Sequence, residues 1–254
     1  ETYGGRIKFL TFKEASDRLK DNLLGGQSLR NAGGNDAGIR LLDANDDGYL
    51  DVLLGHENER AMRIWQPSKQ EYRTVETSLN VLSKSGETAG LKHGVFWANG
   101  PVAFLYRTEN SEGAWVRSEN GVEEKGSLIS ELRCEGKPVQ TLLKGSGNGV
   151  IVYDVDGDSI DELIVAYHDQ HGILKWNQSR QTWEDLNYSW PEDLHLIDDE
   201  GRDAGVRLVD INGDDHPDLL KSDEQDYAAY IFIPELVLGF QKGWTRLVME
   251  GQRG

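Results

Sequence analysis

Oxygen-bearing side chains recur at positions 1, 3, 5 and 9 of three short acidic stretches. The first acidic loop covers residues 43–51, the second 154–162 and the third 210–218. Carboxylates gathered around one point repel one another at neutral pH unless a cation lies between them. Calcium accepts roughly six to eight oxygen ligands in an irregular shell, whereas magnesium needs stricter octahedral geometry. The pattern therefore favours calcium.

The candidate ligands are the side chains at positions 1, 3, 5 and 9 and the backbone carbonyl at position 7, which predicts about one ion in each of the three loops. They are Asp43, Asn45, Asp47, Tyr49 and Asp51; Asp154, Asp156, Asp158, Ile160 and Glu162; and Asp210, Asn212, Asp214, His216 and Asp218. A single acidic turn is also compatible with a solvated Asx turn. Three copies in register favour calcium, with a structural role in which binding adds to the folding free energy.

The loops belong to a repeat, since the leading aspartates Asp154 and Asp210 are 56 positions apart. Residues 36–43 reappear as 203–210, and a related run is found at 149–154. Residues 94–99 align as a further copy in which six loop residues are missing. There, Asn99-Gly100-Pro101 is expected to form only a tight turn that binds no metal.

Each repeat contains four short runs typical of strands, separated by turn residues. In the first repeat they are 38–42, 51–55, 62–66 and 72–76, and in the last 205–209, 218–221, 228–233 and 244–250. An aromatic residue recurs in the third run, at Trp65, Trp176 and Phe232, with Trp115 expected in the shortened repeat. Packing between sheets explains these aromatics more simply than sugar stacking.

These features predict an all-β fold, a β-propeller of four-stranded blades with repeats at about 29–84, 85–140, 141–195 and 196–250. The four repeats either close on themselves or form an arc of a larger propeller. Closure is favoured because an open arc exposes two apolar blade faces. Residues 1–28 are set apart: 6–12 are expected to form a strand and 13–24 an amphipathic helix, with Thr11 and Glu14 as a capping box and Gly25-Gly26 as its end.

The acidic loops resemble those of FG-GAP or VCBS-type repeats, the calcium-loop blades also found in integrin α-subunit propellers, over about residues 29–250. This resemblance implies three calcium sites and a binding or scaffold module for a glycan or protein in an extracellular or periplasmic protein. Position 6, usually glycine in that family, is Gly48 in the first loop but Ser159 and Asp215 in the others. This departure bears on the turn geometry of those two loops.

The chain also resembles repeat segments of large exported bacterial proteins that carry a sorbosone-dehydrogenase-like propeller and a c-type haem domain. A non-catalytic segment of such a larger polypeptide is therefore an alternative. A free-standing polysaccharide lyase is a third possibility, for which no His, Tyr or Lys cluster can be nominated. His168 and His171 are interpreted as loop histidines, because they lack a third convergent ligand.

The composition excludes several classes of partner. A formal net charge of −17 argues against nucleic acids and anionic membrane surfaces, which need a basic face. No apolar run approaches the ~20 residues of a membrane-spanning helix, so no membrane insertion is expected. The single Cys134 excludes a disulfide within the chain and any cysteine-based zinc or haem site.

Two arginines in the first strands are not explained by the loops. Arg40 and Arg207 each follow an aspartate by four residues, Asp36 and Asp203. Their guanidinium groups are candidates for binding a carboxylate-bearing ligand such as an acidic sugar. Local pairing of each arginine with its own aspartate is the simpler interpretation.

Overall fold

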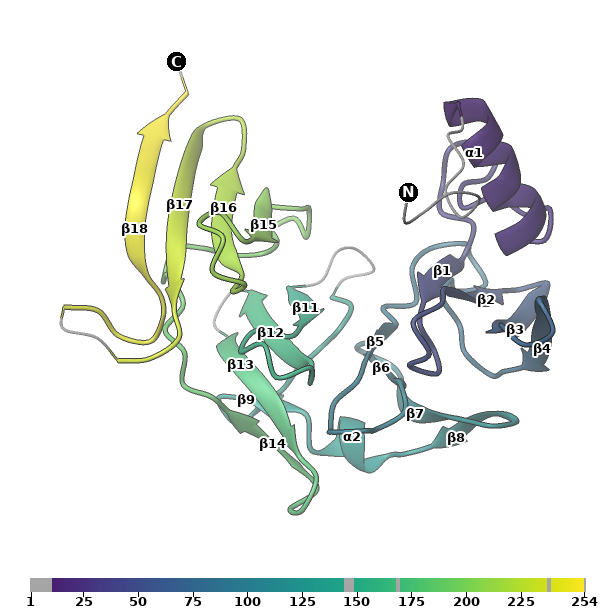
Figure 1. The fold of residues 1–254 in the computed structure, drawn as a ribbon. Helices are drawn as coiled ribbons and strands as arrows, with labels where there is room; N and C mark the ends of the chain where they lie inside the picture. The colour runs from purple at the N-terminus through teal and green to yellow at the C-terminus, as the bar shows by residue number, and fades with distance from the viewer. Residues whose placement is uncertain (1–10, 144–148, 168–169, 237–238, 254) are drawn as a thin grey trace, which may run out of the picture. The chain divides into compact units, whose positions relative to one another are not determined.

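The structure is a computed structural model that describes residues 11–143, 149–167, 170–236 and 239–253. It forms two compact units, residues 1–87 and 88–254. The described chain consists mainly of antiparallel strands, arranged in four four-stranded sheets and one two-stranded sheet (Figure 1). In each four-stranded sheet the strands are hydrogen-bonded in chain order. The all-β prediction is therefore confirmed.

The first unit contains a helical segment and one sheet. Helix α1 (Phe12–Arg18) continues into a π-helical turn (Leu19–Leu23). The sheet is formed by β1 (Ile39–Leu42), β2 (Asp51–His56), β3 (Glu59–Gln66) and β4 (Glu71–Glu76). Leu24 is buried in the same core as Ile39, Val52 and Leu54, so the helical segment is anchored to this sheet.

The predicted capping box is confirmed, because the Thr11 hydroxyl accepts the Glu14 N–H while a Glu14 carboxylate oxygen accepts the Thr11 N–H. Gly25 and Gly26 both have positive φ where the helical segment ends. The expected strand at 6–12 falls mostly outside the described residues, and Phe12 is helical.

The second unit contains three four-stranded sheets and a short insertion. The first sheet is β5 (Lys92–Gly94), β6 (Ala103–Arg107), β7 (Glu112–Ser118) and β8 (Gly121–Glu124); the second is β11 (Val150–Tyr153), β12 (Glu162–Tyr167), β13 (Gln170–Asn177) and β14 (Thr182–Asp185); the third is β15 (Val206–Val209), β16 (Asp218–Ser222), β17 (Asp226–Ile233) and β18 (Gly243–Gln252). The insertion consists of α2 (Ser127–Ser130), β9 (Arg133–Cys134) and β10 (Lys137–Pro138).

Sheet β11–β14 contributes to two hydrophobic cores among the described residues of this unit. Successive side chains of a strand point to opposite faces. Leu163 and Val165 accordingly pack in the core shared with sheet β5–β8, whereas Ile164 and Ala166 pack in the core shared with sheet β15–β18. The three sheets therefore pack face to face, with β11–β14 in the middle.

The pairing of β6 with β7 corrects the predicted alignment of the second repeat. Leu105 pairs with Ala114 as Leu53 pairs with Met62, and each of these leucines lies two residues before the carbonyl that accepts N–H groups from the following connector, Arg107 in one repeat and Gly55 in the other. The position of Trp65 is consequently taken by Arg117, and the prediction for Trp115 was wrong.

In this alignment residues 95–103 match the first acidic loop at full length. The assumed loss of six residues was therefore wrong, because the loop keeps its length and loses its carboxylates. The tight turn is present, with the Gly100 N–H donating to the Trp97 carbonyl at 2.9 Å. The first strand accordingly ends at Gly94 instead of continuing over 94–99.

A hydrogen-bonded clip closes each of the first three repeats. The connector that follows the fourth strand donates backbone N–H groups to a carbonyl near the end of the second strand. The Gly55 carbonyl accepts from Val81 and Leu82, that of Arg107 from Thr141 and Leu142, and that of Ala166 from Leu196. The clip satisfies these buried carbonyl groups without a fifth strand.

Candidate metal centres

The three acidic loops share one backbone conformation, organised by the carboxylate at position 1. In each loop this carboxylate accepts the N–H groups of positions 5 and 6. The distances are 3.1 and 2.7 Å to Asp43, 3.1 and 2.9 Å to Asp154, and 3.2 and 3.1 Å to Asp210. The position 5 carboxylate then accepts the N–H of position 7, at 3.0 Å in all three.

Left-handed backbone angles occur at positions 4 and 6 of every loop. At position 6 the φ values are 81° for Gly48, 67° for Ser159 and 66° for Asp215. The departure from glycine therefore leaves the turn unchanged, although a non-glycine residue in this region costs about 1–3 kcal/mol. Such strain is tolerated because the position 1 carboxylate holds the turn.

The position 9 carboxylates are fully buried and bridge the loop to the sheet. Asp51 accepts the N–H of Ala44, at 2.9 Å, and that of Trp65, at 2.8 Å. Asp218 makes the same pair of contacts with Ile211 and Phe232. Burial raises the pKa of Asp51, and the two backbone hydrogen bonds act in the opposite direction. Position 9 thus has a structural role in addition to its predicted role as a ligand.

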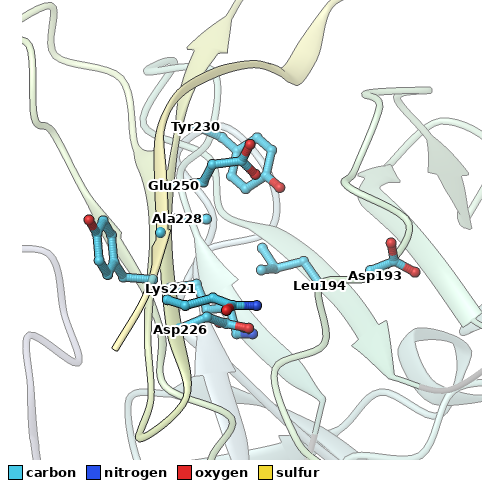
Figure 2. A pocket seen from close by; sticks show the side chains of 10 residues that line it. Asp193, Leu194, Lys221, Asp226, Ala228, Tyr230 and Glu250 are labelled. Carbon is cyan, nitrogen blue, oxygen red and sulfur yellow. The ribbon is translucent and has the colours of Figure 1, made fainter. Parts of the chain in front are cut away.

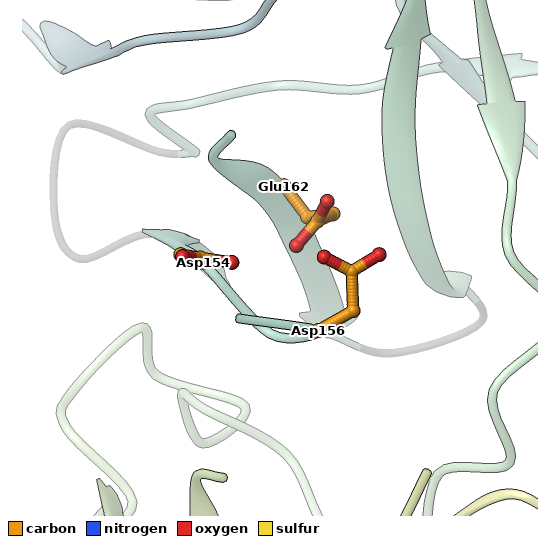
Figure 3. Close-up of side chains that lie close together, drawn as sticks. All are labelled: Asp154, Asp156 and Glu162. Atoms are coloured by element: carbon orange, nitrogen blue, oxygen red, sulfur yellow. The ribbon is translucent and has the colours of Figure 1, made fainter. Parts of the chain in front are cut away.

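The second acidic loop has the tightest group of carboxylates in the described part of the chain. Oxygens of Asp154, Asp156 and Glu162 lie within 4.8 Å of one another (Figure 3). Glu162 accepts the Val155 N–H with one oxygen and faces the Lys175 ammonium with the other. Burial raises the pKa of Glu162 to about 7, against the opposing effect of its hydrogen bond with Lys175.

Lys175 brings a cationic side chain into this group, which sequence reasoning missed. Burial alone lowers the pKa of Lys175, but hydrogen bonds with Asp158, Glu162 and Asp156 outweigh burial and raise it above its usual value.

Asp161, at position 8 of the second acidic loop, was also missed by the sequence analysis. It accepts the Val95 N–H at 2.7 Å and thereby ties the second loop to sheet β5–β8.

The first and third acidic loops have the donor set that a hard divalent cation prefers. Each combines three carboxylates with one amide oxygen. In the first loop, Asn45 Oδ1 is buried and has no hydrogen-bond partner among the described residues. Within the ranges that the structure describes, no lysine or arginine forms an ion pair with the acidic side chains of these two loops.

Arg40 and Arg207 both form local ion pairs. Each guanidinium group makes a two-pronged contact with the aspartate four residues earlier, at 2.6 and 3.0 Å for Asp36 and 2.6 and 2.9 Å for Asp203. The simpler interpretation of these arginines is therefore the one observed. Their role in binding an acidic ligand stays a prediction.

His171 contacts another histidine. Its Nε2 lies 3.3 Å from Nδ1 of His195, and the two rings are stacked. His168 lies outside the described residues. None of the helices in the described ranges combines the length and apolar character needed to cross a membrane.

A cavity of about 500 Å³ lies in the second unit, beside the third sheet (Figure 2). Tyr227 and Tyr230 of β17 and Glu250 of β18 line it, together with Lys221 and Asp193. Burial raises the pKa of Tyr230, and the charges of Glu250 and Asp193 act in the same direction. The cavity therefore combines aromatic surface with both hydrogen-bond acceptors and a cation.

Comparison with solved structures finds a similar fold in a lectin from Agrocybe aegerita that specifically recognises non-reducing terminal N-acetylglucosamine. The TM-score is 0.53 and the identity 11%, over 87% of this chain. This chain spans about half of that structure, 53% of its length. At this identity the likeness concerns the fold alone.

A weaker likeness, with a TM-score of 0.42 and 16% identity, links 81% of this chain to 9% of a chain of the Photorhabdus luminescens Tc holotoxin pore. No family model matches the sequence. No curated protein matches it either.

Proposed function

We propose that this chain is a β-propeller module of an extracellular or periplasmic protein that binds glycans and is stabilised by calcium. The four sheets are its blades, whether they close on themselves or form an arc of a larger ring. Face-to-face packing of the three sheets in the second unit, each with strands in chain order, supports a propeller. The likeness to a lectin supports a glycan as the ligand.

The cavity beside sheet β15–β18 is the observation that carries glycan binding. Its volume, about 500 Å³, suits a small ligand. Tyr230 provides a flat amphipathic ring against which the apolar face of a sugar ring can pack. Glu250 and Asp193 can accept hydrogen bonds from sugar hydroxyl groups, and Lys221 can donate them.

Calcium in the first and third acidic loops is the structural part of this proposal. The three loops share one turn geometry, and Asn45 Oδ1 of the first loop, which is buried without a hydrogen-bond partner, is the kind of ligand that calcium takes up. Ions at these positions stabilise the folded state by mass action, since the unfolded chain has no assembled site.

A glycan array with the purified chain, followed by calorimetric titration of the glycans retained, tests the function. Tyr230→Ala and Glu250→Gln are expected to weaken binding at least tenfold, while Tyr153→Ala, which removes an exposed tyrosine outside the cavity, leaves it unchanged. Absence of binding to any glycan, or equal affinity of the Tyr230→Ala chain, would refute the assignment.

A further inference from the structure

The ammonium group of Lys175 lies among the carboxylates of the second acidic loop. Its Nζ is 2.7 Å from Glu162 Oε1, 2.8 Å from Asp158 Oδ2 and 2.9 Å from Asp156 Oδ2. The Lys175 side chain is only 19% exposed, and Glu162 is fully buried. Three of the four predicted side-chain ligands of a calcium ion are thus bound to a cation that belongs to the chain itself.

The register of the strands explains how Lys175 reaches this position. In an antiparallel pair, directly opposite residues project from the same face. Lys175 of β13 lies opposite the position 9 residue Glu162, one step beyond the pair Leu163 and Leu174. The loop and the third strand of the sheet are therefore joined by an ion pair at this point.

No other sheet has a charged residue opposite position 9. The equivalent residues are Ile64 in sheet β1–β4, Val116 in sheet β5–β8 and Ile231 in sheet β15–β18. An aliphatic side chain cannot neutralise a carboxylate. In the first and third loops, neutralisation is left to an external ion.

The loop that faces a lysine also carries one more acidic side chain at its ligand positions. Position 3 is Asn45 in the first loop and Asn212 in the third, but Asp156 in the second. At positions 1, 3, 5 and 9 the second loop consequently has four carboxylates, whereas each of the other two loops has three. Lys175 brings the net charge of these four side chains and the lysine together to minus three, the value of the corresponding side chains in the other loops. The extra aspartate and the lysine therefore occur together, in the same repeat.

We propose that Lys175 is the resident cation of the second acidic loop, so that calcium occupies the first and third loops but not the second. This inference rests on the calcium part of the proposed function. A calcium ion entering the second loop has to displace an ammonium group that already donates charge-assisted hydrogen bonds to Asp156 and Asp158 and forms an ion pair with Glu162. The second acidic loop is thus stabilised by Lys175 and not by a metal ion.

The number of calcium ions bound per chain, counted by native mass spectrometry and calorimetry, tests the inference. The unaltered chain is expected to bind two. Lys175→Ile introduces the residue found in the equivalent positions, and the triple variant Asp156→Asn, Glu162→Asp, Lys175→Ile gives the second loop the ligands of the other two. Both are expected to bind three. Arg180→Met, which removes a cation of the same sheet region that pairs with Glu184 instead, is the control and is expected to keep two.

Three ions in the unaltered chain, or two in the triple variant, would overturn the assignment. If no variant binds calcium, the calcium proposal itself fails, and melting in chelator then decides the role of Lys175. In chelator, Lys175→Ile leaves the four carboxylates at positions 1, 3, 5 and 9 without a counter-charge and is expected to melt below Arg180→Met. Equal melting temperatures would show that Lys175 is not the cation of the loop.

Discussion

The carboxylate of Asp51 accepts the backbone N–H of Trp65 at 2.8 Å and so fastens the first acidic loop to the third strand of its sheet. Its second oxygen accepts the Ala44 N–H, and the side chain is fully buried. Because a carboxylate is here an acceptor for two amides, the loop has a metal-independent contribution to stability.

Removing this carboxylate should destabilise the chain even without metal. In Asp51→Ala both buried N–H groups lose their acceptor, at a cost of about 1–3 kcal/mol each. Urea unfolding in the presence of chelator measures the loss. Asp46→Asn, an exposed acid in the same loop, is expected to change stability by less than about 0.5 kcal/mol. Equal midpoints for the two variants would contradict the structural role of Asp51.

Chelation is expected to lower the melting temperature of the unaltered chain markedly. A site filled at a hundred times its dissociation constant contributes about 2.7 kcal/mol to stability, and that contribution disappears with the ion. Asp47→Ala should reproduce part of the loss and should reduce the effect of chelator. Differential scanning calorimetry with added calcium or chelator gives the comparison. A melting temperature that changes with neither calcium nor chelator would exclude calcium as a stabilising ion.

Arg107 is expected to be indispensable for the insertion that follows β8. It is 8% exposed and donates hydrogen bonds to the carbonyls of Ile129 and Leu132 and to Glu112. Arg107→Met leaves these acceptors without a donor and should cost about 2–5 kcal/mol.

The matched control for Arg107 is Arg180→Met. Arg180 pairs with Glu184 in an arrangement where the arginine side chain is 74% exposed, and its loss should cost less than about 1 kcal/mol. Denaturant unfolding of both variants separates the two cases. Similar losses of unfolding free energy in the two variants would mean that the burial of Arg107 does not add to stability.

Acid should weaken the hairpin between β16 and β17. Backbone hydrogen bonds from Asp226 and Gln225, with help from Lys221, lower the pKa of Asp223 to about 2. A depressed carboxyl pKa contributes stability that is complete above the unfolded-state value of about 3.9 and is lost as the pH falls to about 2.

Asp223→Asn should therefore be less stable than the unaltered chain at pH 6, and the difference should shrink towards pH 2. Melting curves across this range, with Glu224→Gln as the neighbouring control, check the prediction. A difference that stays constant with pH would show that the Asp223 charge does not matter.

The sequence was sufficient to predict the strands that flank each acidic loop, because carboxylate spacing and apolar runs coincide there. It failed where the carboxylates are absent. Thr88-Ala89-Gly90 stands where the first repeat has Asp36-Ala37-Gly38 and the last repeat has the same three residues, and the Thr88 hydroxyl accepts the Gly90 N–H as Asp36 accepts that of Gly38. Without the aspartate as a guide, the second repeat was aligned out of register.

Lys175 was missed for a different reason, since its role depends on a cross-strand pair and not on the spacing within the loop. A signal was nevertheless present. The residue 21 positions after the start of the acidic loop is isoleucine for the first loop (Ile64) and the third loop (Ile231). For the second loop it is Lys175. Only the register of the strands shows that this residue faces position 9.

The clip that ties each connector to its own second strand has a consequence for how such a chain can change over time. Because the strands of each sheet pair in chain order and each connector returns to the preceding sheet, most backbone pairings join residues that are close in sequence, which favours rapid local folding. A whole repeat can then be duplicated or lost in one genetic event while the strand pairing within each remaining sheet is kept. After such a duplication, a single repeat can lose its metal ligands independently of the others, as the second repeat has lost the carboxylates of its loop.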